Sequence, residues 1–117
     1  MVNFIFQKTL IIGVGLIGSS IARALRELGI SSEIHGVDTS DDVLAKCNNL
    51  NILSSVKKNL NDYSYQFDLI IICSPLSTYK KIFSSLNKFV IKPTLVTDVG
   101  STKMSVIQDY QDTCSNQ

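Results

Sequence analysis

Three glycines stand where an apolar strand pattern changes to a helical pattern near the start of the chain. Gly13, Gly15 and Gly18 have the spacing of a loop that holds a pyrophosphate. Gly13 allows a tight turn out of the strand, Gly15 a close approach of backbone to phosphate, and Gly18 close packing of the helix on the sheet. The free N–H groups at the helix start, at Leu16 and Ile17, would then face the phosphates, where the helix dipole favours negative charge.

An acid follows at the distance that a dinucleotide-binding unit requires. Asp38 stands 20 residues after Gly18, at the end of a second apolar stretch. Its carboxylate can accept hydrogen bonds from both hydroxyls of an adenosine ribose, and it would repel a 2′-phosphate. Thr39 and Ser40 offer no cation to relieve that repulsion, so we expect NAD in preference to NADP. The alternatives are a helix-capping acid and a glycine-rich turn of another α/β protein.

Two further segments are expected at the same edge of the sheet, because ligands bind outside the carboxyl ends of parallel strands. Cys73, Ser74 and Pro75 end a strongly apolar stretch and are expected beneath the nicotinamide-side ribose. An ordinary strand-to-helix turn, with proline at the first helical position, is a compatible alternative. Gly100 is expected against the cofactor. Ser101 either caps the last helix or presents its hydroxyl to a substrate beside the nicotinamide.

The elements that must position these residues alternate between strand and helix. Strands are predicted at 8–12, 33–37, 52–56, 67–73 and 93–98, and helices at 17–28, 40–48, 78–89 and 102–110. This alternation predicts an α/β fold with a doubly wound parallel sheet of the Rossmann type. With right-handed crossovers, we expect the strand order 3-2-1-4-5.

Helical spacing assigns the inner faces of two helices. In the first helix these residues are Ile17, Ile21, Ala24, Leu25 and Leu28. In the helix at 78–89 they are Tyr79, Ile82, Phe83 and Leu86. Gly29 is expected to end the first helix, and residues 61–66 are expected to form a polar loop.

The composition limits the class of protein. With 117 residues and 44% hydrophobic content, the chain can form one domain, residues 1–117, but not a second, substrate-binding domain. A net charge of +1 implies no attraction to nucleic acid or membrane. We see no signal peptide or membrane span, and the widely spaced Cys47, Cys73 and Cys114 suit a reducing cytoplasm and lack metal-ligand spacing. We therefore expect a cytoplasmic protein without a metal site.

Four segments together resemble the N-terminal half of the prephenate/arogenate (cyclohexadienyl) dehydrogenase family. They are Ile11-Ile-Gly-Val-Gly-Leu-Ile-Gly-Ser-Ser, His35-Gly-Val-Asp, Asp68-Leu-Ile-Ile-Ile-Cys-Ser-Pro and Thr97-Asp-Val-Gly-Ser-Thr-Lys. The resemblance covers almost the whole chain and is weakest at residues 48–66. Many dehydrogenases share the glycine loop, whereas its combination with Thr-Asp-Val-Gly-Ser-x-Lys is far more specific.

The resemblance implies an NAD-dependent oxidoreductase of tyrosine biosynthesis. Such an enzyme transfers hydride from prephenate or arogenate to NAD while carbon dioxide leaves, and Ser101 would help to orient the reacting hydroxyl and the catalytic histidine. In the family that histidine lies in a Gly-His-Pro-type segment beyond the last helix, which this chain does not reach. The only histidine here, His35, is on the adenosine side and is expected to be structural.

The family's helical C-terminal domain, which dimerises and completes the substrate site, also lies beyond this chain. We therefore expect a domain that is incomplete at its C-terminal end, with apolar surface exposed beside the fifth strand and little or no activity alone. A second chain or a homodimer through the missing domain would complete it. The alternatives are an NAD-binding module without catalysis, or another hydroxyacid or imine oxidoreductase.

Overall fold

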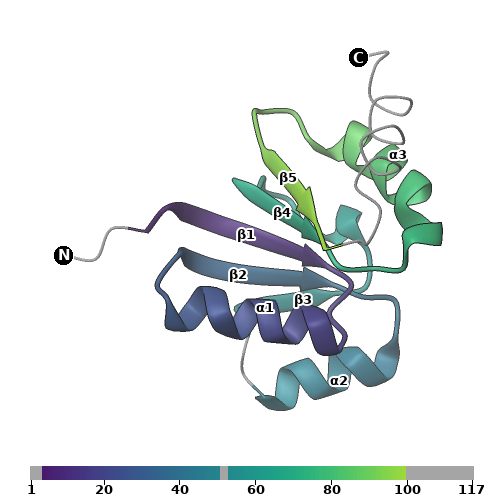
Figure 1. Ribbon diagram of the computed structural model, residues 1–117. Helices are drawn as coiled ribbons and strands as arrows, with labels where there is room; N and C mark the ends of the chain where they lie inside the picture. The colour runs from purple at the N-terminus through teal and green to yellow at the C-terminus, as the bar shows by residue number, and fades with distance from the viewer. Residues whose placement is uncertain (1–3, 51–52, 100–117) are drawn as a thin grey trace.

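The computed structural model describes residues 4–50 and 53–99 of the chain. Within them a five-stranded sheet has the order β3-β2-β1-β4-β5, and all four neighbouring pairs are parallel (Figure 1). The strands are β1 (Phe6–Ile12), β2 (Ser31–Val37), β3 (Ser55–Lys57), β4 (Leu69–Ile72) and β5 (Leu95–Asp98). The predicted fold class and strand order are confirmed.

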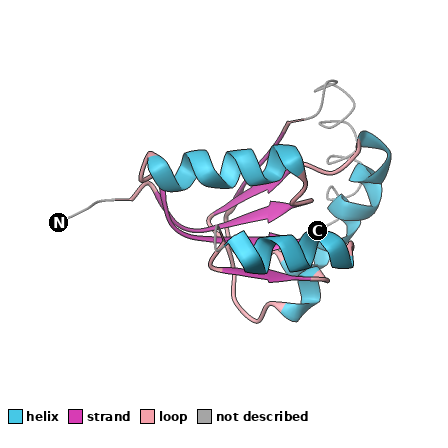
Figure 2. Cartoon of the chain, turned by 90° about the horizontal axis from the view of Figure 1, so that it is seen from below, coloured by secondary structure: helices cyan, strands magenta, loops and turns pink. Residues whose placement is uncertain are grey.

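Helices cover both faces of the sheet, and in Figure 2 helices and strands form distinct layers. They are α1 (Leu16–Glu27), α2 (Asp41–Leu50) and α3 (Tyr79–Phe89). Side chains of a strand alternate between the two faces. Leu10 and Ile12 therefore pack in the core beneath α3, whereas Ile11 packs in the core beneath α1 and α2. The continuous apolar runs of β1 and β4 thus reflect burial on both sides.

Helix α1 buries a different face from the one its apolar spacing predicts. Gly18, Ala22 and Leu25 are buried, whereas Ile17 is 58% and Leu28 72% exposed. The reason is that Gly18 lies against the backbone of the glycine loop, and this contact turns Gly18, Ala22 and Leu25 toward the sheet. The prediction that Ile17, Ala24 and Leu28 lie on the inner face is therefore wrong.

Gly29 ends α1 as predicted. Its φ is 65°, in the left-handed region that favours glycine. The Gly29 N–H donates to the Arg26 carbonyl at 3.2 Å, and the Ile30 N–H donates to the Leu25 carbonyl at 3.0 Å. This pair of bonds is a Schellman motif, which satisfies the last carbonyls of the helix.

The segment predicted as a polar loop at 61–66 contributes to the core. Tyr63 is only 4% exposed, and its hydroxyl donates to the Gly36 carbonyl at 2.9 Å. Burial raises the pKa of this hydroxyl, so it remains a donor. Tyr63 is the C-cap residue of a short 3₁₀ turn, Leu60–Asp62. The adjacent strand, β3, is also shorter and later than the predicted 52–56, because only Ser55–Lys57 pair with β2.

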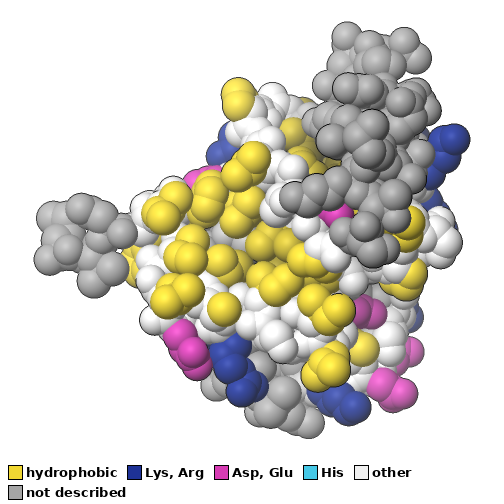
Figure 3. Space-filling model, viewed as in Figure 1, with side chains coloured by type: hydrophobic (Ala, Val, Ile, Leu, Met, Phe, Trp, Pro, Cys, Tyr) yellow, Lys and Arg dark blue, Asp and Glu magenta, His cyan; other side chains and the backbone are white. Residues whose placement is uncertain are grey.

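The α3 face is confirmed, and apolar surface lies exposed beside β5 as expected. Tyr79, Phe83 and Leu86 are buried on α3, with Ile82 packed against them. In β5 and just after it, Leu95 is 57% and Val99 43% exposed. Figure 3 shows hydrophobic side chains gathered on the face that is turned toward the viewer in Figure 1. The predicted helix at 102–110 lies outside the described residues.

We predict that Phe83→Ala lowers the free energy of unfolding by about 3–5 kcal/mol, because it empties a fully buried aromatic site. Leu28→Ala is the control. Since Leu28 is exposed, its truncation should change the free energy by no more than about 0.5 kcal/mol. Urea unfolding followed by circular dichroism measures both, and equal losses would contradict the assigned core.

Candidate functional site

The glycine loop after β1 is shaped by backbone contacts that exclude side chains. Gly13 has a φ of 89°, and a Cβ atom there would lie 2.5 Å from the Ser74 hydroxyl oxygen. A Cβ atom on Gly18 would overlap the carbonyl oxygen of Gly13. At Gly15, in contrast, a Cβ atom would meet nothing within 4 Å. Two glycines therefore allow close packing, and the third borders open space that a ligand can approach.

The N-terminus of α1 opens onto the same space. Gly15 is its N-cap residue, no side chain caps it, and its first turn contains no acidic residue. The first N–H groups of a helix have no acceptor within the helix. The side chains of Leu16 and Ile17 are 87% and 58% exposed, and the first turn of α1 carries no acid that would repel an anion. This arrangement is a ready anion site.

Asp38 joins the end of β2 to the glycine loop. Its Oδ2 accepts from the Val14 N–H at 2.8 Å, and its Oδ1 accepts from the Ser40 N–H at 2.9 Å. A carboxylate offers about four lone-pair positions, so about two remain for a ligand. The carboxylate is thus held in place by the protein and can still accept from a diol.

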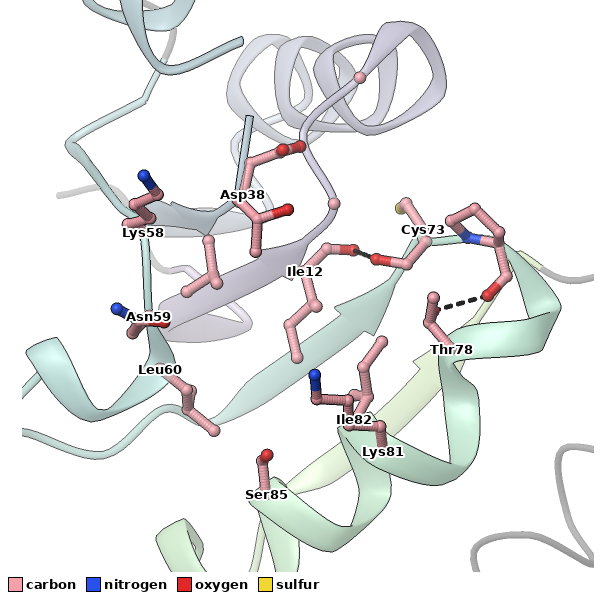
Figure 4. Close-up of a pocket in the computed structure, with 16 residues that line it drawn as sticks. Ile12, Asp38, Lys58, Asn59, Leu60, Cys73, Thr78, Lys81, Ile82 and Ser85 are labelled. Carbon is pink, nitrogen blue, oxygen red and sulfur yellow. Dashed lines mark hydrogen bonds between the residues drawn. The ribbon is translucent and has the colours of Figure 1, made fainter. Parts of the chain in front are cut away.

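A cavity of about 520 Å³ collects the ends of four segments (Figure 4). Seven of the predicted residues line it: Gly13, Gly15, Asp38, Thr39, Cys73, Ser74 and Pro75. Three predicted residues, Leu16, Ile17 and Gly18, do not line it, although the first turn of α1 borders it at Gly15. Gly100 and Ser101 lie outside the described residues. The cavity therefore joins the predicted phosphate loop, acid and fourth-strand segment in one place.

The cavity also has walls that the sequence analysis missed. One follows β3 and the other is a face of α3, and together they contribute Lys58, Asn59, Leu60, Thr78, Lys81, Ile82 and Ser85. The α3 residues have the spacing of one helical face, and the others follow directly after a strand of the same sheet. Strand order and helical periodicity together would have found them.

The Cys73–Pro75 segment closes the cavity at the end of β4. The Cys73 N–H donates to the Ile12 carbonyl at 2.8 Å, and the Ser74 hydroxyl donates to the same oxygen at 3.3 Å. Pro75 is not the first residue of an α-helix, which was the alternative interpretation of this segment. It is the N-cap of a 3₁₀ turn, Leu76–Thr78, with an extended ψ of 145° that lets the chain turn before α3 begins.

His35 lies away from this cavity. It is 3% exposed, with Nδ1 2.6 Å from the Ser55 hydroxyl and Nε2 2.9 Å from Glu33 Oε1. Its ring packs against Tyr63 and Phe67. Both ring nitrogens therefore have side-chain partners, Ser55 and the half-exposed Glu33, as expected of a structural histidine.

Among the described residues, no group of three or more His, Cys, Asp or Glu side chains is arranged to hold a metal ion. No helix among these residues has the length and apolar character to cross a membrane.

A parallel sheet of this order, an uncapped helix after a glycine loop, and an acid ending the second strand are together typical of nucleotide-binding α/β domains of the Rossmann type. The family model of the prephenate dehydrogenase nucleotide-binding domain matches residues 21–117. The chain therefore belongs to the prephenate dehydrogenase family, in its nucleotide-binding domain.

Known relatives support this family assignment. A cyclohexadienyl dehydrogenase of Zymomonas mobilis is 31% identical over 112 residues, which are 96% of this chain and 38% of that protein. A prephenate dehydrogenase of Lactococcus lactis is 35% identical over 103 residues, 87% of this chain and 28% of that protein. The chain thus spans about a third of the length of the curated relatives it matches.

A solved structure carries ligands. The crystal structure of the Aquifex aeolicus prephenate dehydrogenase, in complex with hydroxyphenyl propionate and NAD+, superposes with a TM-score of 0.82 at 30% identity. The match covers 92% of this chain and 38% of that one.

We predict that Cys73 reacts slowly with iodoacetamide at pH 8. Burial raises the pKa of its thiol to about 11, so the reactive thiolate forms only as the pH rises toward that value. Alkylation should be about tenfold or more slower than in the urea-unfolded chain, and should accelerate between pH 8 and 11. Mass spectrometry of the Cys73 peptide measures the rate. Equal rates in the folded and unfolded chain at pH 8 would contradict the assigned burial.

Proposed function

We propose that this cavity binds NAD. The observation that carries the proposal is the uncapped N-terminus of α1 beside open space at Gly15, with the Asp38 carboxylate in the same cavity. The amides of Gly15, Leu16 and Ile17 would hold the pyrophosphate, and Asp38 the adenosine ribose. Thr39 would border the adenosine, and Cys73, Ser74 and Pro75 the nicotinamide-side ribose. Gly18 contributes indirectly, by seating the helix.

The charges around Asp38 favour NAD over NADP. Asp41 and Asp42 occupy the first turn of α2, directly after the acid. Lys58 lines the cavity together with Asp38. It forms an ion pair with Asp41, with 3.2 Å between Lys58 Nζ and Asp41 Oδ1. A 2′-phosphate would meet the Asp38 carboxylate, and the lysine beside it is already paired with Asp41, so repulsion would outweigh attraction.

Calorimetric titration of Asp38→Asn tests the ribose assignment. We expect its NAD affinity to fall about tenfold or more relative to the unaltered chain, since a charged acceptor is lost. The preference for NAD over NADP should narrow, because one repulsive charge is removed. Glu27→Gln, at the far end of α1, is the control and should bind as the unaltered chain does.

Thermal unfolding of both variants shows whether the fold is retained, because Asp38 also accepts two backbone hydrogen bonds. Undiminished NAD affinity in a folded Asp38→Asn variant would refute the ribose assignment.

We further propose that the bound cofactor serves the oxidative decarboxylation of prephenate or arogenate within a larger assembly. Family membership and the names of the relatives support this. NAD+ would supply the hydride acceptor, and Ser101 would orient the reacting hydroxyl. The remaining two thirds of a relative's length, as a second chain or a continuous one, would supply the base and cover the apolar surface beside β5.

A binding module without its own turnover is the second candidate, and the burial of His35 favours it for this polypeptide. A general base must reach the proton that it removes. The only histidine of the sequence is instead hydrogen-bonded within the sheet, outside the cavity.

We predict that the 117-residue chain, supplied with NAD and prephenate or arogenate, forms no NADH above the enzyme-free rate. NADH fluorescence measures this, and a full-length relative is the positive control. Turnover that is saturable in substrate would contradict the prediction and show that a residue other than His35 acts as base.

A further inference from the structure

The first turn of α3 carries charges that its own helix disfavours. Lys80 and Lys81 are its second and third residues, and the turn contains no acidic residue. Cations near a helix N-terminus are unfavourable, because the dipole there is positive. A local arrangement that works against its own helix is a reason to look for a function.

Only one of the two lysines faces the cavity. Lys81 lines it together with Thr78, Ile82 and Ser85, whereas Lys80 does not. Buried side chains hold this orientation: Tyr79 and Phe83, on either side of the lysines, are at most 1% exposed. Figure 4 shows the Lys81 side chain rising from α3 into the cavity.

Two lysines line the cavity, and Lys81 is the one without an ion-pair partner among the described residues. The charged residues lining the cavity there are Asp38, Lys58 and Lys81. Asp38 accepts two backbone hydrogen bonds, and Lys58 pairs with Asp41. No ion pair joins Lys81 to another residue that the structure describes.

We propose that Lys81 binds the phosphate groups of the dinucleotide from the wall opposite the glycine loop. The inference rests on the proposed NAD site and adds a charge to it, since the loop and the first turn of α1 offer amides but no cation. The pyrophosphate is a better target for Lys81 than a 2′-phosphate, because Asp38 lines the ribose end of the cavity and would repel a 2′-phosphate there. Lys81 thus makes the cavity favour anionic nucleotides over neutral nucleosides.

The test compares Lys81→Met, which keeps the length of the side chain without its charge, with Lys80→Met on the same turn. Both remove an unfavourable charge from the helix N-terminus, so both should stabilise the chain alike. Calorimetry of the full chain with ADP, adenosine and 2′-AMP then separates the roles. For Lys81→Met we expect ADP affinity to fall about three- to tenfold and adenosine affinity to be unchanged. For Lys80→Met neither should change.

The outcomes separate a failure of the proposed NAD site from a failure of the role proposed for Lys81. If the unaltered chain binds neither NAD nor ADP, the proposed function fails and the role of Lys81 fails with it. If the chain binds both but Lys81→Met retains ADP affinity, or Lys80→Met loses as much, the NAD site stands and the inference is overturned. Equal losses for ADP and adenosine, or a loss confined to 2′-AMP, would also overturn it.

Discussion

Close backbone packing at the glycine loop is the constraint on which the rest of the site depends. At Gly13 the chain leaves β1 with a positive φ and passes within reach of Ser74, at the end of β4. At Gly18 the helix returns so close to Gly13 that no side chain fits between them. The Gly13 N–H also donates to the Val37 carbonyl at 2.8 Å, which ties the turn to β2. Three strand ends are thereby fixed around one loop.

That packing decides which groups the cavity presents. Because Gly18 sets the rotation of α1, its first amides open onto the loop side while Leu16 and Ile17 extend into solvent. The Asp38 carboxylate, held by the Val14 N–H, stands beside those amides. A helix end without a side-chain cap leaves backbone N–H groups without acceptors. A ligand that combines phosphates with a diol would satisfy those amides and use the remaining acceptor positions of Asp38.

The sequence predicts this architecture well because its signals are local. The continuous apolar runs of β1 and β4, the stop at Gly29 and the apolar face of α3 each depend on periodicity or on one residue's conformational freedom. The glycines and Asp38 were found in the same way, since their spacing along the chain reflects one strand-turn-helix unit and the strand after it.

What the sequence could not show depends on tertiary contacts. The rotation of α1 follows from a backbone contact at Gly18, which overrides the apolar spacing of Ile17 and Leu28. The burial of Tyr63 depends on a carbonyl 27 residues away, at Gly36. Lys81 was missed because nothing near it in the chain resembles a binding motif. Lys81 reaches the cavity because α3 follows β4 in the chain and β4 lies beside β1 in the sheet.

Residue-resolved NMR tests most directly whether the glycine loop and the start of α1 form the phosphate site. Titration of the ¹⁵N-labelled chain with ADP should shift the amides of Gly15, Leu16 and Ile17 most strongly, with smaller shifts at Asp38 and Thr39. Amides at the far end of α1, around Glu27, should not move. Saturable shifts that leave Gly15–Ile17 unmoved would contradict the account, as would a folded chain that shows no shifts at all.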